Sequence, residues 1–542
     1  MSFSPSLMPE AQRDVKSLLK LADVTDTRAL GSQDRTESRV LRFLELAHLA
    51  GQATQSDDSA TVVHSLAQPP PTPERPAYDV SYAAIHRLND DILLHIFNCY
   101  RLDDVFGWND RLGWRKLSHV CQRWRYIMHE SPFHLGMHIE CTYGTPIVDM
   151  LDHLPPLPLL IHYKYLSADT MTEQDEMGIY YALQFHDRVR QINLHLSPAI
   201  LKKCLAHMDA CFPTLENLSL SFSGDEITIF TLPEAFLAPN LRHLDLPRIA
   251  LPKRLRLLTS TVSLVTLSLG CVQFSGYFCP RLLVARLWSL SQLEELTIEF
   301  CVPIPRTSSE NEMLDEQGSP KTLPNLRTLT FQGFGEYLEH LVAQIRVPLL
   351  ERLDITLSNQ LTFTLPHLYH LINITEGFKL PSAKVCFGLL DVYIVMARRR
   401  LFLSEGDFLL RVKCNRLDRQ IDCAAQICRA LIPTLSGVER ITLDLYYYWM
   451  PDTEGRFSGI DSTMWREFLR LFIGAKELFI SEPLEEELAR ALQVDEVGAE
   501  PGFLPNLKHI GAADNLFASF IDTRRAVNRP VQFSRWSLLA YS

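Results

Sequence analysis

Apolar residues recur in one short pattern from about residue 185 to the C-terminus. The pattern is apolar-x-x-apolar-x-apolar, and the first seven of its ten copies begin 23 to 33 residues apart. Its last positions alternate, which predicts a short β-strand with every second side chain buried. The chain must return between two strands, and segments such as 199–208 and 337–345 have helical spacing. The copies begin at Val189, Leu215, Leu241, Leu264, Leu293, Leu326, Leu350, Val438, Ala475 and Leu507.

The spacing of these copies resembles that of leucine-rich repeats, whose period is about 20–29 residues. Several copies follow a proline that would end a helix and lead into the strand, as at Pro239, Pro324 and Pro505. The asparagine or cysteine that usually follows such a strand is present in register only once, as Cys301. The resemblance implies an α/β fold for residues 141–542: an irregular solenoid with a curved parallel sheet and a C-terminal cap.

The concave face of such a sheet is suited to holding a protein. Its candidate target-binding residues are the polar positions that alternate with the buried ones, since they should point away from the core. Taken singly, each of these positions is also typical of an ordinary solvated sheet. The candidates are Ser219, Asp245, Ser268, Thr297, Thr330, Asp354 and Asp444.

Residues 357–437 lack a clean copy of the repeat. We expect irregular strands at 384–387, 391–396 and 409–413, followed by a helix near 423–431. The apolar run 385–397 is too short for a membrane span, which needs about 20 residues, and Gly388 and Asp391 interrupt it. Residues 517–525 are predicted to form a capping helix, followed by a tail through Trp536.

Residues 1–77 precede this pattern. Asp34 and Glu37 form a capping-box spacing ahead of an amphipathic stretch, which predicts either a helix or a transient, solvated one. Prolines then crowd between residues 69 and 76. Because proline lacks a backbone donor and disfavours helix before it, we expect a disordered linker.

Residues 78–140 are predicted to hold two short amphipathic helices. The first begins after Asn89, a good cap, with Asp90 and Asp91 in its first turn. The second carries apolar residues on one face and basic residues on or beside the other. Helices of this length are marginal alone, so their apolar faces must pack on the rest of the chain or on a partner.

This segment resembles an F-box, most closely those of F-box proteins numerous in mushroom-forming fungi. The resemblance lies in Leu88 followed by 91–93 and 96–97, then Val-Cys-x-x-Trp-Arg at 120–125, Ser-Pro-x-x-Leu at 131–135 and Pro-Pro-Leu-Pro at 155–158. Asn89 stands where a proline is common, and the loop between Tyr100 and Trp114 is longer than in compact F-boxes. The resemblance implies binding to the Skp adaptor of a cullin ubiquitin ligase. The residues facing the adaptor or supporting that contact would be Leu88, Ile92, Leu93, Ile96, Phe97, Trp114, Leu117, Val120, Cys121 and Trp124.

Composition narrows the other function classes. A net charge of -11 disfavours binding to the phosphate backbone of a nucleic acid, so we expect no nucleic-acid partner. The basic run 398–400 is too short to change this expectation. No two of the twelve cysteines have CxxC spacing, which argues against a metal site. The N-terminus lacks an apolar signal core, so we expect a cytoplasmic or nuclear protein that is not secreted. Without hydrolase, kinase or nucleotide-binding motifs, we expect no catalytic residues and no cofactor.

Two functional hypotheses follow. In the first, the chain is a substrate-recognition adaptor of a Skp–cullin–F-box ubiquitin ligase, and its repeats bind a target protein. In the second, it is a free-standing protein-binding scaffold whose F-box-like helices only cap the solenoid. The first predicts that Ile92, Ile96, Phe97 and Trp124 form an exposed apolar patch, whereas the second predicts that the first repeats cover them.

Overall fold

The computed structural model describes most of the chain from Leu88 onward. The described residues are 88–103, 117, 120–130, 137–154, 156–164, 171–224, 230–252, 256–272, 280–300, 319–358, 364–397, 407–414, 417–445, 462–493 and 504–536. Several predictions therefore lie outside them: the helix and linker of residues 1–77, Trp114, the motif at 131–135 and the basic run at 398–400.

The chain divides into two compact units, Met1–Gly136 and Met137–Ser542. The first contains helices α4, Asp90–Asp103, and α6, Gln122–Glu130. As the sequence predicts, Asn89 caps α4: its side-chain oxygen accepts a hydrogen bond of 2.8 Å from the backbone N–H of Ile92. Asp90 and Asp91 place negative charge at the positive end of the helix dipole.

The second unit is built on one large, mostly parallel sheet, so this part of the chain is mixed α/β. Its sixteen described strands follow the order β1-β2-β3-β4-β6-β8-β9-β11-β13-β16-β15-β14-β17-β18-β19-β20. Two small sheets, β5 with β7 and β10 with β12, lie outside it. The strands are β1 Ile139–Cys141, β2 Leu159–Lys164, β3 Val189–Leu196, β4 Asn217–Phe222, β5 Phe230–Thr231, β6 His243–Asp245, β7 Ile249–Ala250, β8 Thr266–Val272, β9 Glu295–Phe300, β10 Lys321–Thr322, β11 Thr328–Gly333, β12 Ile345–Arg346, β13 Arg352–Leu357, β14 Ser382–Phe387, β15 Asp391–Ala397, β16 Phe408–Lys413, β17 Arg440–Leu445, β18 Glu477–Ile480, β19 His509–Ala512 and β20 Gln532–Arg535.

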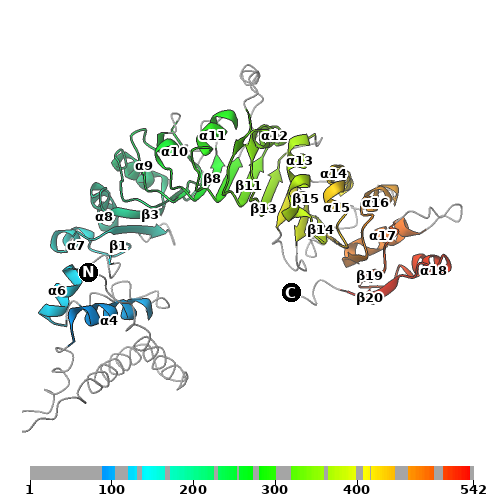
Figure 1. Ribbon diagram of the computed structural model, residues 1–542, viewed down its shortest axis with the longest axis horizontal. Helices are drawn as coiled ribbons and strands as arrows, with labels where there is room; N and C mark the ends of the chain where they lie inside the picture. The colour runs from blue at the N-terminus through cyan, green and yellow to red at the C-terminus, as the bar shows by residue number, and fades with distance from the viewer. Residues whose placement is uncertain are drawn as a thin grey trace, which may run out of the picture. The chain divides into compact units, whose positions relative to one another are not determined.

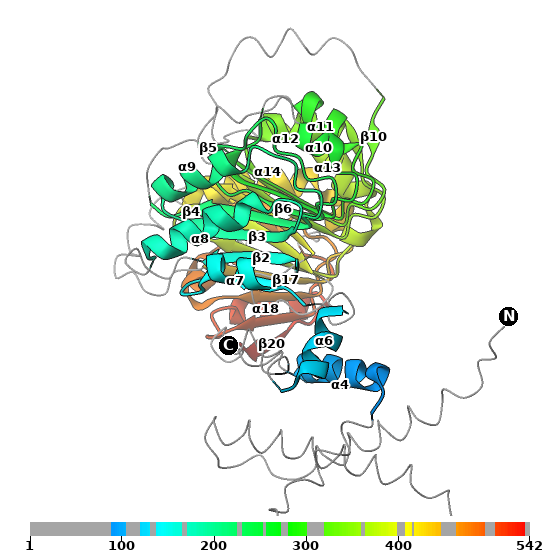
Figure 2. The ribbon, with the colours of Figure 1, turned by 90° about the vertical axis from the view of Figure 1, so that its left-hand side faces the viewer.

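Helices line the outer, convex side of this sheet, and the other side forms its inner, concave face (Figure 1). From the N-terminal side of the unit, α7, α8 and α9 follow one another beside β2, β3 and β4 (Figure 2). The helices of the unit are α7 Ile147–His153, α8 Glu173–Gln184, α9 Pro198–His207, α10 Arg256–Ser260, α11 Pro280–Leu287, α12 Gly335–Ala343, α13 Pro366–Ile374, α14 Leu417–Ala430, α15 Ile432–Leu435, α16 Ser462–Leu469, α17 Glu485–Leu492 and α18 Ala518–Ala526.

All ten copies of the apolar pattern lie at strands of the large sheet, and their thirty apolar positions are at most 3% exposed. In β4, for example, Leu218 and Leu220 are buried whereas Ser219 between them is half-buried. The prediction of alternately buried strands is therefore confirmed. The apolar side chains form the core between sheet and helices, and the polar ones line the inner face.

The region without a clean repeat departs from chain order. The three strands expected there are present, but β16 rather than β14 pairs with β13, and β14 pairs with β17. β15 runs antiparallel between β14 and β16, so the sheet is not wholly parallel as expected. These strands are regular rather than irregular, and the helix expected near 423–431 is α14.

An asparagine ladder joins successive turns before the strands. In the Pro-Asn-Leu segments, the side-chain N–H groups of Asn240, Asn325 and Asn506 donate to carbonyls of the preceding turn, at Pro213, Ser291 and Ile473, over 2.7, 2.8 and 2.9 Å. These contacts satisfy carbonyls left without partners where the chain turns. The expected helix near the C-terminus is present as α18. The predicted tail after it forms a further strand, β20, at the edge of the sheet.

Candidate functional site

The inner face of the sheet carries six of the seven candidate target-binding residues in one row. Strand register places Ser219 beside Asp245, Asp245 beside Ser268, and Ser268 beside Thr297. The row continues through Thr330 to Asp354. All six side chains are half-buried. The structure thus brings together residues that the sequence separates by up to 135 positions, from 219 to 354.

Asp444 differs from this expectation. Register continues the row from Asp354 through Leu409, Val395 and Lys384 to Thr442, so Asp444 lies two residues beyond it. Its carboxylate is buried and pairs with the ammonium group of Lys384 over 2.9 Å. The polar position did not imply exposure, because Asp444 lies beside Cys386 of β14, where the inner face is buried.

The inner face at β14–β16 is an apolar cluster formed by Cys386, Tyr393, Val395 and Leu409. Burial raises the pKa of the Cys386 thiol to about 12, so it is neutral at physiological pH. Burial alone would lower the pKa of Lys384, but the neighbouring Cys386 and Asp444 groups raise it, and the net direction is upward. We attribute this rise to Asp444, because a neutral thiol carries no charge to stabilise an ammonium group. Lys384 and Asp444 therefore form a charged pair in an apolar setting.

Carboxylates dominate the charge of the inner face between β6 and β13. Asp245 accepts a hydrogen bond of 3.1 Å from the Ser219 hydroxyl. The pKa of Glu299 is raised, first by burial and then by the negative charges of Asp354 and Asp245. Burial also raises the pKa of Asp354, although Arg411 and Arg352 act in the opposite sense. Asp245, Glu299 and Asp354, from three different strands, are therefore close enough for their charges to interact.

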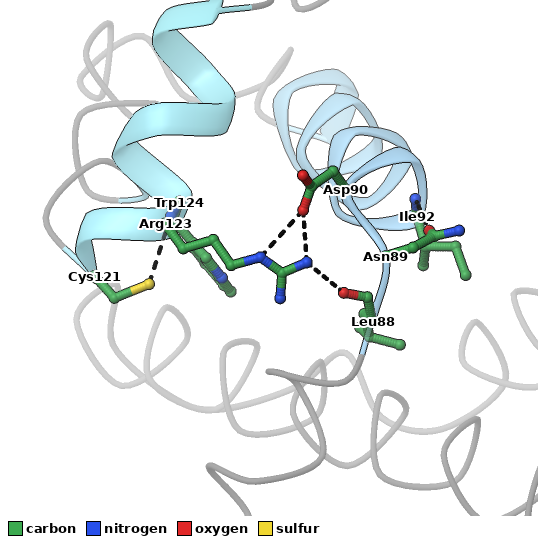
Figure 3. A network of polar contacts seen from close by, with 7 residues as sticks. All are labelled: Leu88, Asn89, Asp90, Ile92, Cys121, Arg123 and Trp124. Atoms are coloured by element: carbon green, nitrogen blue, oxygen red, sulfur yellow. Dashed lines mark hydrogen bonds and ion pairs between the residues drawn. The ribbon is translucent and has the colours of Figure 1, made fainter.

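In the first unit, a polar network fastens the two helices together (Figure 3). The Arg123 guanidinium donates to the Asp90 carboxylate through Nε over 3.1 Å, and to the Leu88 carbonyl through Nη2 over 2.6 Å. The backbone N–H of Trp124 points to Cys121 Sγ, 3.5 Å away. The Arg123 contacts tie the start of α6 to the start of α4, and the Cys121 contact caps α6 itself.

The F-box-like residues that the structure describes fall into three groups. Leu93, Phe97 and Trp124 are buried, and the Phe97 and Trp124 rings pack with centroids 4.8 Å apart. Ile92 and Val120 are 47% and 55% exposed. The half-buried group is Leu88, Ile96, Leu117 and Cys121.

The expected patch of Ile92, Ile96, Phe97 and Trp124 is thus not uniformly exposed. Two helices this short bury apolar area most readily by pairing their largest side chains. Phe97 and Trp124 therefore support the module, and Ile92 and Val120 are the predicted contact residues that remain accessible.

No model of a known protein family matches the chain, and no curated protein matches it. Within the described residues, none of the helices is long and apolar enough to cross a membrane. The same residues contain no group of three metal-ligating side chains.

Three side chains with notable contacts or pKa shifts were not among the residues that the sequence singled out. Glu299 occupies the next inner-face position after Thr297, and its alternation with Ile298 was the signal for it. Lys384 lies 60 positions before its partner Asp444, and no local pattern links the two. Arg123 is one of the basic residues of the second helix, and its contact with Asp90, 33 positions earlier, has no local signal in the sequence.

Proposed function

We propose that this protein is a non-catalytic substrate-recognition adaptor of a Skp–cullin–F-box ubiquitin ligase. The first unit is an F-box-like module that docks a Skp-type adaptor and, through it, a cullin. The second unit is a leucine-rich-repeat solenoid whose inner face binds a target protein. The observation that carries the proposal is the combination of two exposed apolar side chains, Ile92 and Val120, on a two-helix module with a continuous polar row on a separate sheet.

The mechanism in this proposal is proximity. The chain performs no bond-making step and instead holds the target near the enzymes of the ligase, which raises the effective concentration of the reacting groups. Free Ile92 and Val120 suit the adaptor contact, because apolar side chains gain most when a partner removes them from water. The half-buried polar row suits target recognition, because its side chains retain access to solvent.

The test is calorimetric titration of the full chain with a purified Skp-type adaptor. We expect stoichiometric binding by the unaltered protein. Ile92→Asp with Val120→Asp should weaken binding at least about 100-fold, because each places a charge in an apolar contact. Leu93 is a poor choice for this test, since it is fully buried and its replacement by aspartate would unfold the module.

The matched control is Val262→Asp with Val527→Asp. These valines are 57% and 55% exposed and lie in the second unit, so the chemistry is the same and the predicted contact is untouched. The control should bind like the unaltered chain. Absence of binding by the unaltered chain would overturn the adaptor proposal and leave the free-standing scaffold as the better account. Equal binding by both double variants would overturn the assignment of Ile92 and Val120 to the contact.

A further inference from the structure

The inner face between β6 and β13 has a floor of short hydroxyl side chains bordered by acids. Ser268, Thr297 and Thr330 are register neighbours on β8, β9 and β11. Asp245 on β6 and Asp354 on β13 close the two ends of this row. Short side chains leave room above the sheet, so an occupant can approach the carboxylates without displacing large groups.

Glu299 extends the acidic field over this floor. A Cβ placed on Gly270 of β8 would lie 3.6 Å from Glu299 Oε2, so the carboxylate of β9 leans over the neighbouring strand. It thus approaches the side of the floor on which Asp245 lies. Its pKa is raised, first by burial and then by Asp354 and Asp245, because a further negative charge is unfavourable there.

Two arginines act on the acid at the β13 end of the row. Arg352 and Arg411 act on Asp354 and oppose the rise in its pKa. The described hydrogen-bond partner of Asp245 is instead the neutral Ser219 hydroxyl. The described groups that act on Glu299 all raise its pKa, and the two charged ones are acids, so a cation from a partner would relieve the repulsion there.

We propose that the inner face from β6 to β13 binds an extended segment of a target protein that carries several lysine or arginine side chains. This inference rests on the proposed function and specifies the chemistry of the target. Neighbouring strands are about 4.8 Å apart, so Asp245 and Asp354 are separated by four spacings, roughly 19 Å. An extended chain covers that distance in about six residues. Basic residues about six positions apart would meet the two ends, and one midway between them would meet Glu299.

The experiment measures fluorescence anisotropy of the full chain with two labelled probes at low ionic strength. One probe is an extended peptide of about twelve residues with lysine at every third position, and the other has glutamine at those positions. The lysine probe should bind at least about ten-fold more tightly, and added salt should reduce the difference, because exposed charges are screened.

Asp245→Asn with Glu299→Gln should weaken binding of the lysine probe about ten-fold. The control, Asp422→Asn with Glu467→Gln, changes the net charge equally at exposed positions of helices α14 and α16 on the other side of the sheet. It should bind like the unaltered chain. Equal affinity for both probes, or equal losses in both double variants, would overturn the inference. Titration with the Skp-type adaptor in parallel separates this failure from failure of the proposed function, since the adaptor uses the other unit.

Discussion

The inner face of the sheet differs between two parts, strands β4–β13, here called the open part, and strands β14–β16, here called the closed part. From β4 to β13, polar side chains occupy the row and remain half-buried. At β14–β16, the same row holds Lys384, Val395 and Leu409, all at most 9% exposed. The outer core is apolar in both parts. The difference indicates that a strand in this unit is specified by its outer face, while its inner face can be either polar and half-buried or mostly apolar and buried.

The largest expected effect concerns the charged pair in the closed part. Lys384→Met should lower the free energy of unfolding by about 3–5 kcal/mol, because it leaves Asp444 buried without its partner. Urea unfolding measures this effect. Arg327→Met breaks an exposed pair with Glu351 in the open part and should cost at most about 1 kcal/mol. Equal costs would show that burial does not distinguish the two ion pairs.

A second pair of variants compares the same row directly. Val395→Ala should cost about 2 kcal/mol, since it removes buried methyl groups and leaves a cavity. Thr297→Ala, on β9 in the open part, should change stability by less than about 0.5 kcal/mol. Thermal unfolding of both variants is the measurement. A larger loss at Thr297 would contradict the distinction between the open and closed parts.

The loss of stability on removing an asparagine of the ladder should not depend on whether the nearby inner face is open or closed. Asn325→Ala, ahead of the open strand β11, and Asn506→Ala, ahead of β19, each remove one hydrogen bond to a turn carbonyl. Each should cost about 1 kcal/mol in urea unfolding. Asn373→Ala, whose side chain accepts from the Thr434 hydroxyl elsewhere in the unit, provides a comparison with a different contact. If neither ladder variant lost stability, the asparagine hydrogen bonds would not stabilise the fold.

The smallest effect has the opposite sign. Because the pKa of Glu299 is raised in the folded protein, by burial and then by Asp354 and Asp245, the folded state holds this proton to higher pH than the unfolded chain does. Its contribution to stability therefore falls as pH rises above the unfolded pKa, about 4.3. Glu299→Gln should stabilise the protein at pH 7 by on the order of 0.5 kcal/mol.

That gain should vanish near pH 4, where the carboxyl is protonated in both states. Urea unfolding of the variant and the unaltered chain at the two pH values tests it. A loss of stability at pH 7 would mean that Glu299 has a favourable partner, and the open face would then be less ready to receive a cation.

The sequence predicted the positions of the strands better than the order in which they pair in the sheet. Alternation around residues such as Leu218 and Ile441 is local, so each strand could be placed. The pairing of β13 with β16 was not predictable, since it depends on which edges meet after the chain has travelled away and returned. Alternation predicted that Asp354 points away from the core between sheet and helices. The burial of Asp444 could not be predicted in this way, because it depends on the apolar inner face around it. The prediction that the first unit binds a Skp adaptor stays a prediction.

The reversed strand order has a consequence for how the chain reaches its fold. Up to β13, each strand of the large sheet can add to the one before it, so structure can grow as the chain is synthesised. After Leu357 that growth must pause, because the next neighbour, β16, begins only at Phe408. β17 in turn requires β14, which joins the sheet through β15 and β16. Contacts so distant in sequence form slowly. We therefore expect the edge of β13 to be the point at which a nascent chain waits, and at which it depends most on protection from pairing with other chains.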